Sequence, residues 1–113
     1  GMHAAVALLD QHSEITAIIA QSDLLAIGAI QAAEERGLTV PGDLSVVGFD
    51  GARVDGLTTR TLTTVVQPIA EKGRAAARLA LGALADARDG ELRDQLFTSI
   101  LRVGDTTGPP RES

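Results

Sequence analysis

The chain has 113 residues, of which 44% are hydrophobic and 22% are charged, a composition typical of a globular protein rather than a disordered one. Its formal net charge is −5 and it contains no Cys, Trp or Tyr, which excludes disulfides, cysteine-based metal sites and thiol catalysis. An acidic chain without a basic stripe or stacking aromatic residues is poorly suited to binding the phosphate backbone of a nucleic acid. We therefore expect no direct contact of this chain with DNA.

The ends of the sequence carry no sign of a membrane segment or an export signal. No apolar run approaches the length of a membrane span, and no basic segment leads into an apolar signal core. We therefore expect a cytoplasmic protein with no membrane partner. Gly1 before Met2 is typical of the scar of a cleaved expression tag, so we set residues 1–3 apart, expect a domain at residues 4–110, and expect a tail at residues 111–113.

The N-terminal half of the sequence predicts a short helix, a strand and a longer helix. Residues 2–11 form the short helix, and the β-branched residues within 15–20 favour a buried strand. The longer helix, residues 22–36, has a favoured N-cap in Ser22 and a left-handed C′ position in Gly37. It carries apolar residues on more than one face, which indicates either a second covering layer or a subunit contact.

The C-terminal half predicts strand, strand, helix and strand. Residues 44–49 are apolar on both faces apart from Ser45, as expected of a parallel strand covered on both sides. A shorter strand at 62–66 leads into a long helix at 68–88, and the last strand lies at 97–103. Strands alternating with helices predict an α/β fold, a Rossmann-like parallel sheet flanked by helices with right-handed crossovers.

Polar side chains stand at the carboxyl ends of three predicted strands. Ser22 and Asp23 follow the first, Asp50 ends the second, and Gln67 follows the third. In open parallel sheets, ligands bind in the crevice beyond these ends. We therefore expect the four residues to converge on one ligand site.

Each of these residues also has a structural interpretation. For Asp50, the position directly after a buried strand favours ligand contact over a turn-starting role, and its carboxylate would accept hydrogen bonds from the hydroxyls of a sugar or another polyol. For Asp23, helix capping is the favoured interpretation, whereas Ser22 could cap the helix and also face the crevice. Gln67 could contact a ligand or bond only to loop backbone.

Enzymatic function is not favoured. His3 lies at the terminus and His12 in a helix–strand linker, and the sequence shows neither a Ser-His-Asp arrangement nor a glycine-rich phosphate motif. Asp23 and Asp50 could hold Mg²⁺ in a phosphate-receiving module, but that module needs a strand-end lysine and Lys72 lies within a predicted helix. We therefore expect no catalytic residue, no metal and no cofactor.

Three segments of the sequence together resemble a known family. The segments "AIIAQSDLLAIGAIQAAEERGLTVPGDLSVVGFD", "LTTVVQPIAEKGRAAARLAL" and "ILRVGDTTGPP" are similar, in order and spacing, to the C-terminal part of the effector-sensing domain of LacI/GalR transcriptional regulators. The resemblance implies one incomplete lobe of a type I periplasmic-binding-protein-like fold. In that fold two lobes close around a small-molecule effector, and DNA is contacted through a helix-turn-helix that this chain does not contain.

The resemblance also implies roles for the strand-end residues. Asp50 matches the family's effector-contacting acid after the "VVGFD" strand, and Ser22 matches a frequent Asn that touches a sugar hydroxyl. Asp23 matches the acid that follows this Asn, and Gln67 matches the Gln of the family's "TTV-x-QP". The implied ligand is a sugar or a sugar derivative.

Positions of the family's dimer interface match Ile27 and the loop residues Leu57 and Thr58, so a homodimer is implied. Gly104 departs from the family, because an Arg is frequent at its position. The helix at 68–88 packs on the other lobe in the family, and here we expect it to pack against a second copy or to fold back on the sheet.

Three functions are compatible with these observations. The first is the ligand-sensing and dimerisation part of a LacI-type transcriptional regulator, which binds a small carbohydrate-like effector in the intact protein. The second is a sugar-binding protein of the same fold that serves a transporter and requires a secretory signal upstream. The third is a stand-alone dimerisation module that binds no ligand.

Overall fold

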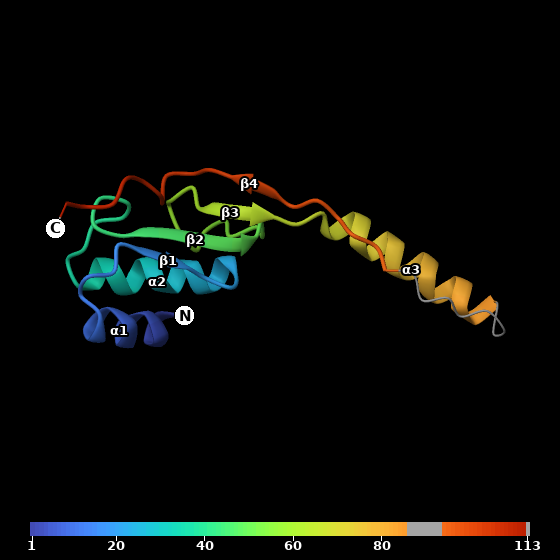
Figure 1. Ribbon diagram of the computed structural model, residues 1–113, viewed down its shortest axis with the longest axis horizontal. Coiled ribbons are helices and arrows are strands. Elements are labelled where there is room, and N and C mark those ends of the chain that lie inside the picture. The colour runs from blue at the N-terminus through green and yellow to red at the C-terminus, as the bar shows by residue number, and fades with distance from the viewer. Residues whose placement is uncertain (86–93, 113) are drawn as a thin grey trace. The chain divides into compact units, whose positions relative to one another are not determined.

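The structure is a computed structural model that describes residues 1–85 and 94–112. The chain forms two compact units, Gly1–Val66 with Ile100–Ser113, and Gln67–Ser99. The elements of the first unit are α1 (Met2–Gln11), β1 (Ala17–Ile19), α2 (Asp23–Glu35), β2 (Ser45–Asp50), β3 (Thr63–Val66) and β4 (Ile100–Arg102), and the second unit holds α3 (Ile69–Ala85) (Figure 1).

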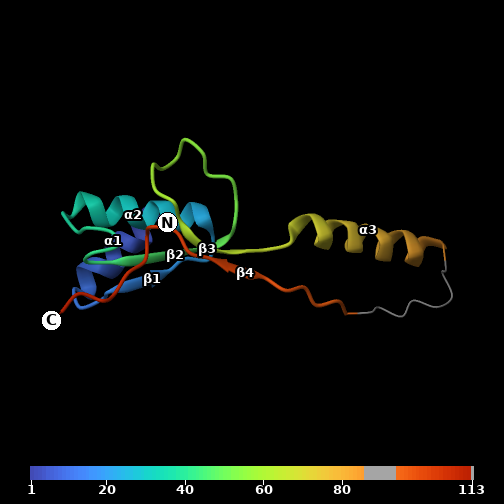
Figure 2. The same cartoon turned by 90° about the horizontal axis from the view of Figure 1, so that it is seen from above.

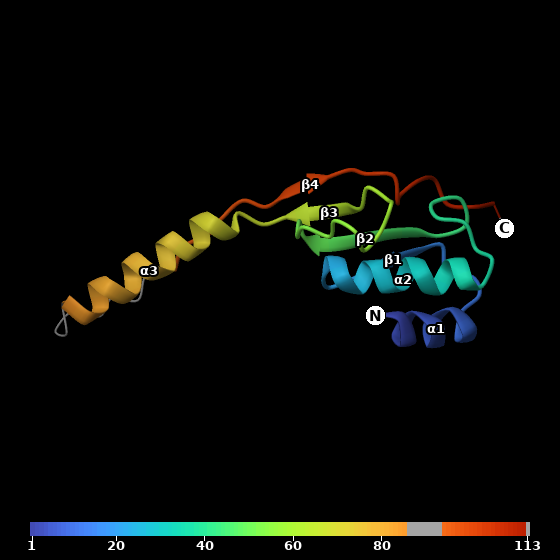
Figure 3. The same cartoon turned by 180° about the vertical axis from the view of Figure 1, so that it is seen from behind.

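The first unit is built on a four-stranded sheet with the order β1-β2-β3-β4 (Figure 3). The first three strands are parallel, which confirms the predicted α/β fold. The last strand differs from the prediction, because it covers only Ile100–Arg102 and runs antiparallel to β3. Its first residue, Ile100, pairs with Val66 at the end of β3. The chain therefore re-enters the sheet at the end where it left and must run back along β3.

Both helices of this unit lie on one side of the sheet, with α2 along the strands and α1 packed against α2 (Figures 1 and 3). The predicted caps of α2 are confirmed: Ser22 is the N-cap, and Gly37 adopts a φ of +74° after the helix. The Arg36 guanidinium joins the helices through two hydrogen bonds of 2.9 Å to the Asp10 carboxylate. The core between the layers contains Ala5, Leu9, Ala26, Ala29, Ile30, Ala32, Ala33, Val40, Leu44, Val46 and Leu62.

The helix α1 accounts for part of the apolar excess on α2, because it supplies a second covering layer. Within α1, Ala5 and Leu9 are buried, but Leu8 stays 39% exposed. Gly1, which the sequence analysis sets apart, is the N-cap residue of α1 and accepts a hydrogen bond of 3.0 Å from the Ala5 N–H.

The prediction of a buried first strand is wrong. Ile18 of β1 is half-buried on the helix side, but Ile19 is 81% exposed on the opposite face. Among the described residues β1 pairs with β2 alone, so it is an edge strand. The β-branched run marked a strand correctly, but propensity for a strand does not require that both of its faces are covered.

The described part of the second unit contains one long helix, α3. It begins at Ile69 and ends at Ala85, close to the predicted 68–88, and residues 86–88 lie outside the described residues. None of the residues of α3 is buried. The expected packing of this helix against a second copy or back on the sheet therefore stays a prediction. None of the described helices is long and apolar enough to cross a membrane.

The C-terminal segment fastens the amino ends of β2 and β3 through Thr106, which has no exposed surface. The Thr106 hydroxyl donates to the carbonyl oxygen of Val46 at 2.7 Å and accepts from the N–H of Thr63 at 3.0 Å. The Thr106 carbonyl oxygen accepts from the N–H of Val46 at 2.8 Å. A single side chain therefore provides a partner for two buried backbone groups, one at the start of β2 and one at the start of β3.

We expect Thr106→Val to destabilise the fold by about 2–4 kcal/mol, because it keeps the shape of the side chain but leaves the Val46 carbonyl and the Thr63 N–H buried without a partner. Thr106→Ser is the matched control, since it keeps the hydroxyl and loses one methyl group at a cost of about 1 kcal/mol. Urea unfolding of both variants measures the difference. A Val variant as stable as the Ser variant would contradict this role of the hydroxyl.

Candidate functional site

Asp50 stands where the sequence predicted it, at the carboxyl end of β2. It is half-buried and opposite Val66 of β3. Its φ is +114°, and Gly51 follows with a φ of +71°. A positive φ is uncommon outside glycine and strains the backbone of a residue with a Cβ. The chain thus makes a sharp, strained turn at Asp50, the residue that the sequence favours most for ligand contact.

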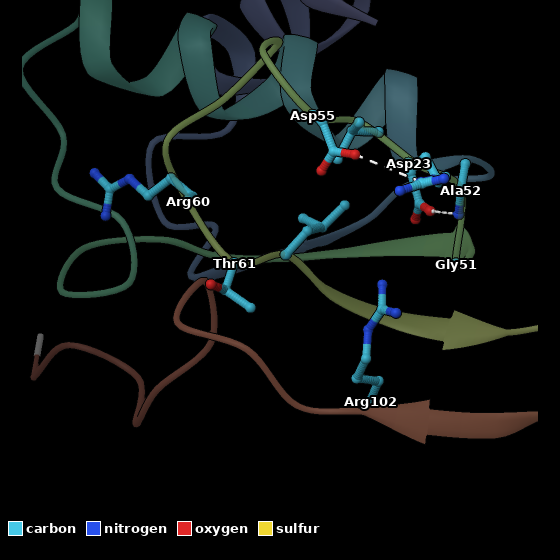
Figure 4. Close-up of a pocket in the computed structure, with 10 residues that line it drawn as sticks. Asp23, Gly51, Ala52, Asp55, Arg60, Thr61 and Arg102 are labelled. Atoms are coloured by element: carbon cyan, nitrogen blue, oxygen red, sulfur yellow. Dashed lines mark hydrogen bonds and ion pairs between the residues drawn. The ribbon is translucent and has the colours of Figure 1, made fainter.

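Asp23, the first residue of α2, turns its side chain into the protein. It is 1% exposed, and both carboxylate oxygens accept hydrogen bonds, of which Figure 4 shows the one from Ala52. One oxygen accepts from the Ala52 N–H at 2.6 Å and the other from the Thr64 hydroxyl at 2.5 Å. Asp23 therefore links the start of α2 to β3 and to the turn after β2. This is a structural task different from simple capping, and ligand contact by Asp23 stays a prediction.

The close approach of Asp23 to the sheet depends on Gly48 of β2. A Cβ at Gly48 would lie 2.3 Å from the Asp23 Oδ1 and 2.8 Å from the Leu62 side chain. No side chain fits in this space without displacing the Asp23 carboxylate. The glycine in the apolar strand "LSVVGFD" thus has a local cause: it makes room for a buried acid from the neighbouring helix.

Ser22 and Gln67 have structural partners of their own. The Ser22 hydroxyl accepts from the Leu25 N–H at 3.3 Å as the N-cap of α2, which confirms the capping interpretation. Gln67 belongs to the second unit, where its Oε1 accepts a hydrogen bond of 2.5 Å from the Lys72 ammonium. Contact of either residue with a ligand stays a prediction.

A cavity of about 320 Å³ lies beneath the loop that joins β2 to β3. Its charged lining mixes both signs, with the exposed pair Arg53–Asp55 at 3.5 Å on one side and Arg102 of β4 on another (Figure 4). The complete lining is Asp23, Gly51, Ala52, Arg53, Val54, Asp55, Arg60, Thr61, Leu62 and Arg102. This cavity adjoins the turn that Asp23 holds.

The far end of the same loop is fastened by Arg60 and Gly104. The Arg60 guanidinium donates to the Val40 carbonyl oxygen at 2.5 Å and to the Glu34 carboxylate at 2.6 Å. Gly104 lies so close to the loop that a Cβ would come within 1.9 Å of the Thr61 carbonyl oxygen. An arginine at position 104 would therefore not fit this backbone, which gives the departure noted in the sequence a steric cause.

The three residues matched to a dimer interface all line a second cavity. Ile27 of α2 and the loop residues Leu57 and Thr58 border a volume of about 330 Å³, where the loop passes beside α2 (Figure 2). Ile27 is only 6% exposed, whereas Leu57 is 54% exposed. The structure thus brings the three residues together, and their role in a dimer stays a prediction.

Thr64 and Ala52 were not predicted as partners of Asp23. A signal for Thr64 existed, because a Thr that is fully buried in a parallel strand requires a partner for its hydroxyl. No signal existed for Ala52, which takes part through its backbone N–H alone.

A second acid organises a turn elsewhere in the first unit. Asp43 accepts from both the N–H and the hydroxyl of Thr39 at 2.8 Å. The backbone hydrogen bond, followed by the hydroxyl, holds the pKa of Asp43 below its ordinary value of 3.8. Within the described residues, no group of three or more His, Cys, Asp or Glu side chains is arranged to hold a metal ion.

Comparison with known proteins gives consistent matches. The profile of the periplasmic binding protein-like domain family matches residues 2–107. Catabolite control protein A of Priestia megaterium is 42% identical over 70% of this chain and 24% of its own length. The HTH-type transcriptional regulator MalR of Streptomyces coelicolor is 46% identical over 72% of this chain and 23% of its own length.

Among solved structures, a LacI family transcriptional regulator from Arthrobacter sp. FB24 in complex with lactose is 34% identical, with a TM-score of 0.79. The match covers 95% of this chain and 41% of that one. The chain thus spans about a quarter of the length of the two curated relatives. Since the family profile covers almost the whole chain, the chain belongs to the periplasmic binding protein-like domain family, in the form found in LacI-type transcriptional regulators.

Proposed function

We propose that this chain is the ligand-sensing and dimerisation part of a LacI-type transcriptional regulator and binds a small carbohydrate-like effector. The observation that carries the proposal is Asp50, an acid held in a strained conformation at the carboxyl end of a central parallel strand. Strained residues cluster where function requires a fixed side-chain position. In open α/β sheets, ligands bind at this edge.

The class of ligand follows from the chemistry of Asp50 and from the relatives. An ionised carboxylate accepts hydrogen bonds from hydroxyl groups, which sugars offer in pairs. A relative of known structure was solved with lactose, and another, from Enterococcus faecium, with ribose. Both relatives are LacI family regulators, which supports a sugar or a sugar derivative as the effector of this protein.

The relatives also support the remaining parts of the proposal. They are transcriptional regulators, which favours a non-enzymatic, cytoplasmic protein whose affinity for an operator responds to the effector. A Lac repressor dimer bound to operator is among the solved structures similar to this chain, at 28% identity and a TM-score of 0.79. Dimerisation of this protein through α2 and the loop between β2 and β3 agrees with the grouping of Ile27, Leu57 and Thr58 around one cavity.

We expect Asp50→Asn to lower the affinity for the effector about 10- to 100-fold in the full-length gene product. The substitution removes a charged acceptor, and a hydrogen bond to a charged group contributes about 1.5–3 kcal/mol. Isothermal titration with a panel of mono- and disaccharides, including lactose and ribose, identifies the effector and measures the loss.

Asp10→Asn is the matched control, because it removes an exposed acid from α1, away from the cavity, where Asp10 pairs with Arg36 at 2.9 Å. This control should bind the effector as the wild type does. Equal affinity of the Asp50 variant and the wild type would remove Asp50 from the site. A wild-type protein that responds to no sugar would contradict the sugar-sensing role and favour the dimerisation module.

We expect Leu57→Glu to shift the protein from dimer to monomer, because it places a charge on the exposed apolar side chain beside the second cavity. Leu96→Glu is the matched control, since Leu96 is fully exposed and lies outside the helices and strands. Analytical ultracentrifugation over a range of concentrations measures the dissociation constants of the three proteins. A Leu57 variant that dimerises as tightly as the control would place the interface elsewhere.

A further inference from the structure

The turn after β2 is held in its conformation from two sides. Asp50 has a φ of +114° and Gly51 a φ of +71°, so two successive residues leave the ordinary backbone regions. On one side, a Cβ at Gly51 would lie 2.9 Å from the Val66 side chain. On the other side, the Ala52 N–H donates to the Asp23 carboxylate at 2.6 Å. A strained conformation persists only where its surroundings determine it in this way.

The Asp23 carboxylate is itself well fixed. It is 1% exposed, it sits in the first turn of α2, where the helix dipole favours a negative charge, and the Thr64 hydroxyl orients its second oxygen at 2.5 Å. Gly48 leaves the space that it occupies. Hydrogen bonds to a carboxylate are stronger than bonds between two neutral groups, and burial strengthens them further. Ala52 lies two residues after Asp50, so its hydrogen bond to Asp23 can oppose the relaxation of the turn.

We propose that Asp23 is a positioning residue: its buried carboxylate holds the turn at residues 50–52, and this hold keeps Asp50 in the strained conformation that aims its carboxylate at the ligand. The inference deepens the proposed function and rests on it for the ligand. This positioning role differs from the role implied by the family motif, in which Asp23 would be one of the residues that contact the ligand. Asp23 acts through Asp50 rather than on the ligand.

A double-mutant cycle on thermal unfolding tests this hold without any ligand. Asp50→Gly relieves the strain, because glycine adopts a positive φ freely, and should raise the Tm of the wild-type protein on the order of 5 °C. In the Asp23→Ala background the turn has already relaxed, so the same substitution should give no gain. The two substitutions are therefore expected to be strongly non-additive.

The control cycle uses Asp43→Ala instead of Asp23→Ala. Asp43 also accepts two hydrogen bonds in a turn, but it lies away from Asp50. Asp50→Gly should raise the Tm equally in the presence and absence of Asp43→Ala. If Asp23→Ala does not fold, Asp23→Leu takes its place, since it keeps the branched shape of the side chain but cannot accept from the Ala52 N–H. A full gain from Asp50→Gly in the Asp23→Ala or the Asp23→Leu background would overturn the proposal.

Effector binding by the full-length gene product supplies the second readout. Asp23→Ala should weaken binding of the sugar found in the titration at least tenfold, although Asp50 is still present. Asp23→Asn should restore most of the affinity, because its carbonyl oxygen can accept from Ala52 and its amide can donate to the Thr64 hydroxyl. Loss of binding in Asp50→Asn with full binding in Asp23→Ala would overturn the proposal. If no sugar binds the wild type, the proposed function fails, and the thermal cycle alone decides whether Asp23 holds the turn.

Discussion

The buried carboxylate of Asp23 is the constraint on which the carboxyl edge of this sheet depends. A carboxyl group with 1% exposure requires partners for both oxygens, and each partner belongs to a different segment of the chain. The Thr64 hydroxyl comes from β3, and the Ala52 N–H comes from the turn after β2. Gly48 must lack a side chain so that the acid can reach them. One group thus sets the spacing of helix, strand and turn.

The amino edge of the sheet is held by side-chain hydroxyls in a similar manner. Its strands are only three to six residues long, so their ladder of backbone hydrogen bonds is short. Thr106 extends this ladder between β2 and β3, and the Ser45 hydroxyl exchanges hydrogen bonds with the backbone of Gly108 at 3.0 and 3.1 Å. The C-terminal segment therefore works as part of the sheet. A sheet that is fixed at both the amino and the carboxyl ends of its strands can carry a strained residue such as Asp50 without rearranging around it.

The sequence predicted those features whose signals are local. The helix α2 has its N-cap at Ser22 and its left-handed residue at Gly37, and Asp50 could be placed because an apolar run ends at it. The direction of β4 could not be predicted, because it depends on where the chain re-enters the sheet after the second unit. The inward direction of Asp23 could not be predicted either, since the space above Gly48 and the hydroxyl of Thr64 are distant in sequence. Sequence patterns thus located the carboxyl end of the sheet and its two acids, whereas the different roles that we propose for Asp23 and Asp50 follow from the contacts of their side chains.

The helix α3 needs an apolar surface to pack against, and the described residues of its own unit do not provide one. It has 17 residues and none of them is buried, although Ile69, Leu81 and Leu84 expose 58%, 67% and 80% of their surface. A helix of this length owes most of its stability in proteins to the packing of an apolar face, because helix propensity alone leaves it marginal in water. The first unit, by contrast, encloses a core between α1, α2 and the sheet. We therefore expect order in α3 to depend on an apolar surface outside the helix, whereas the carboxyl end of the sheet, which carries Asp50, is built from groups within the first unit.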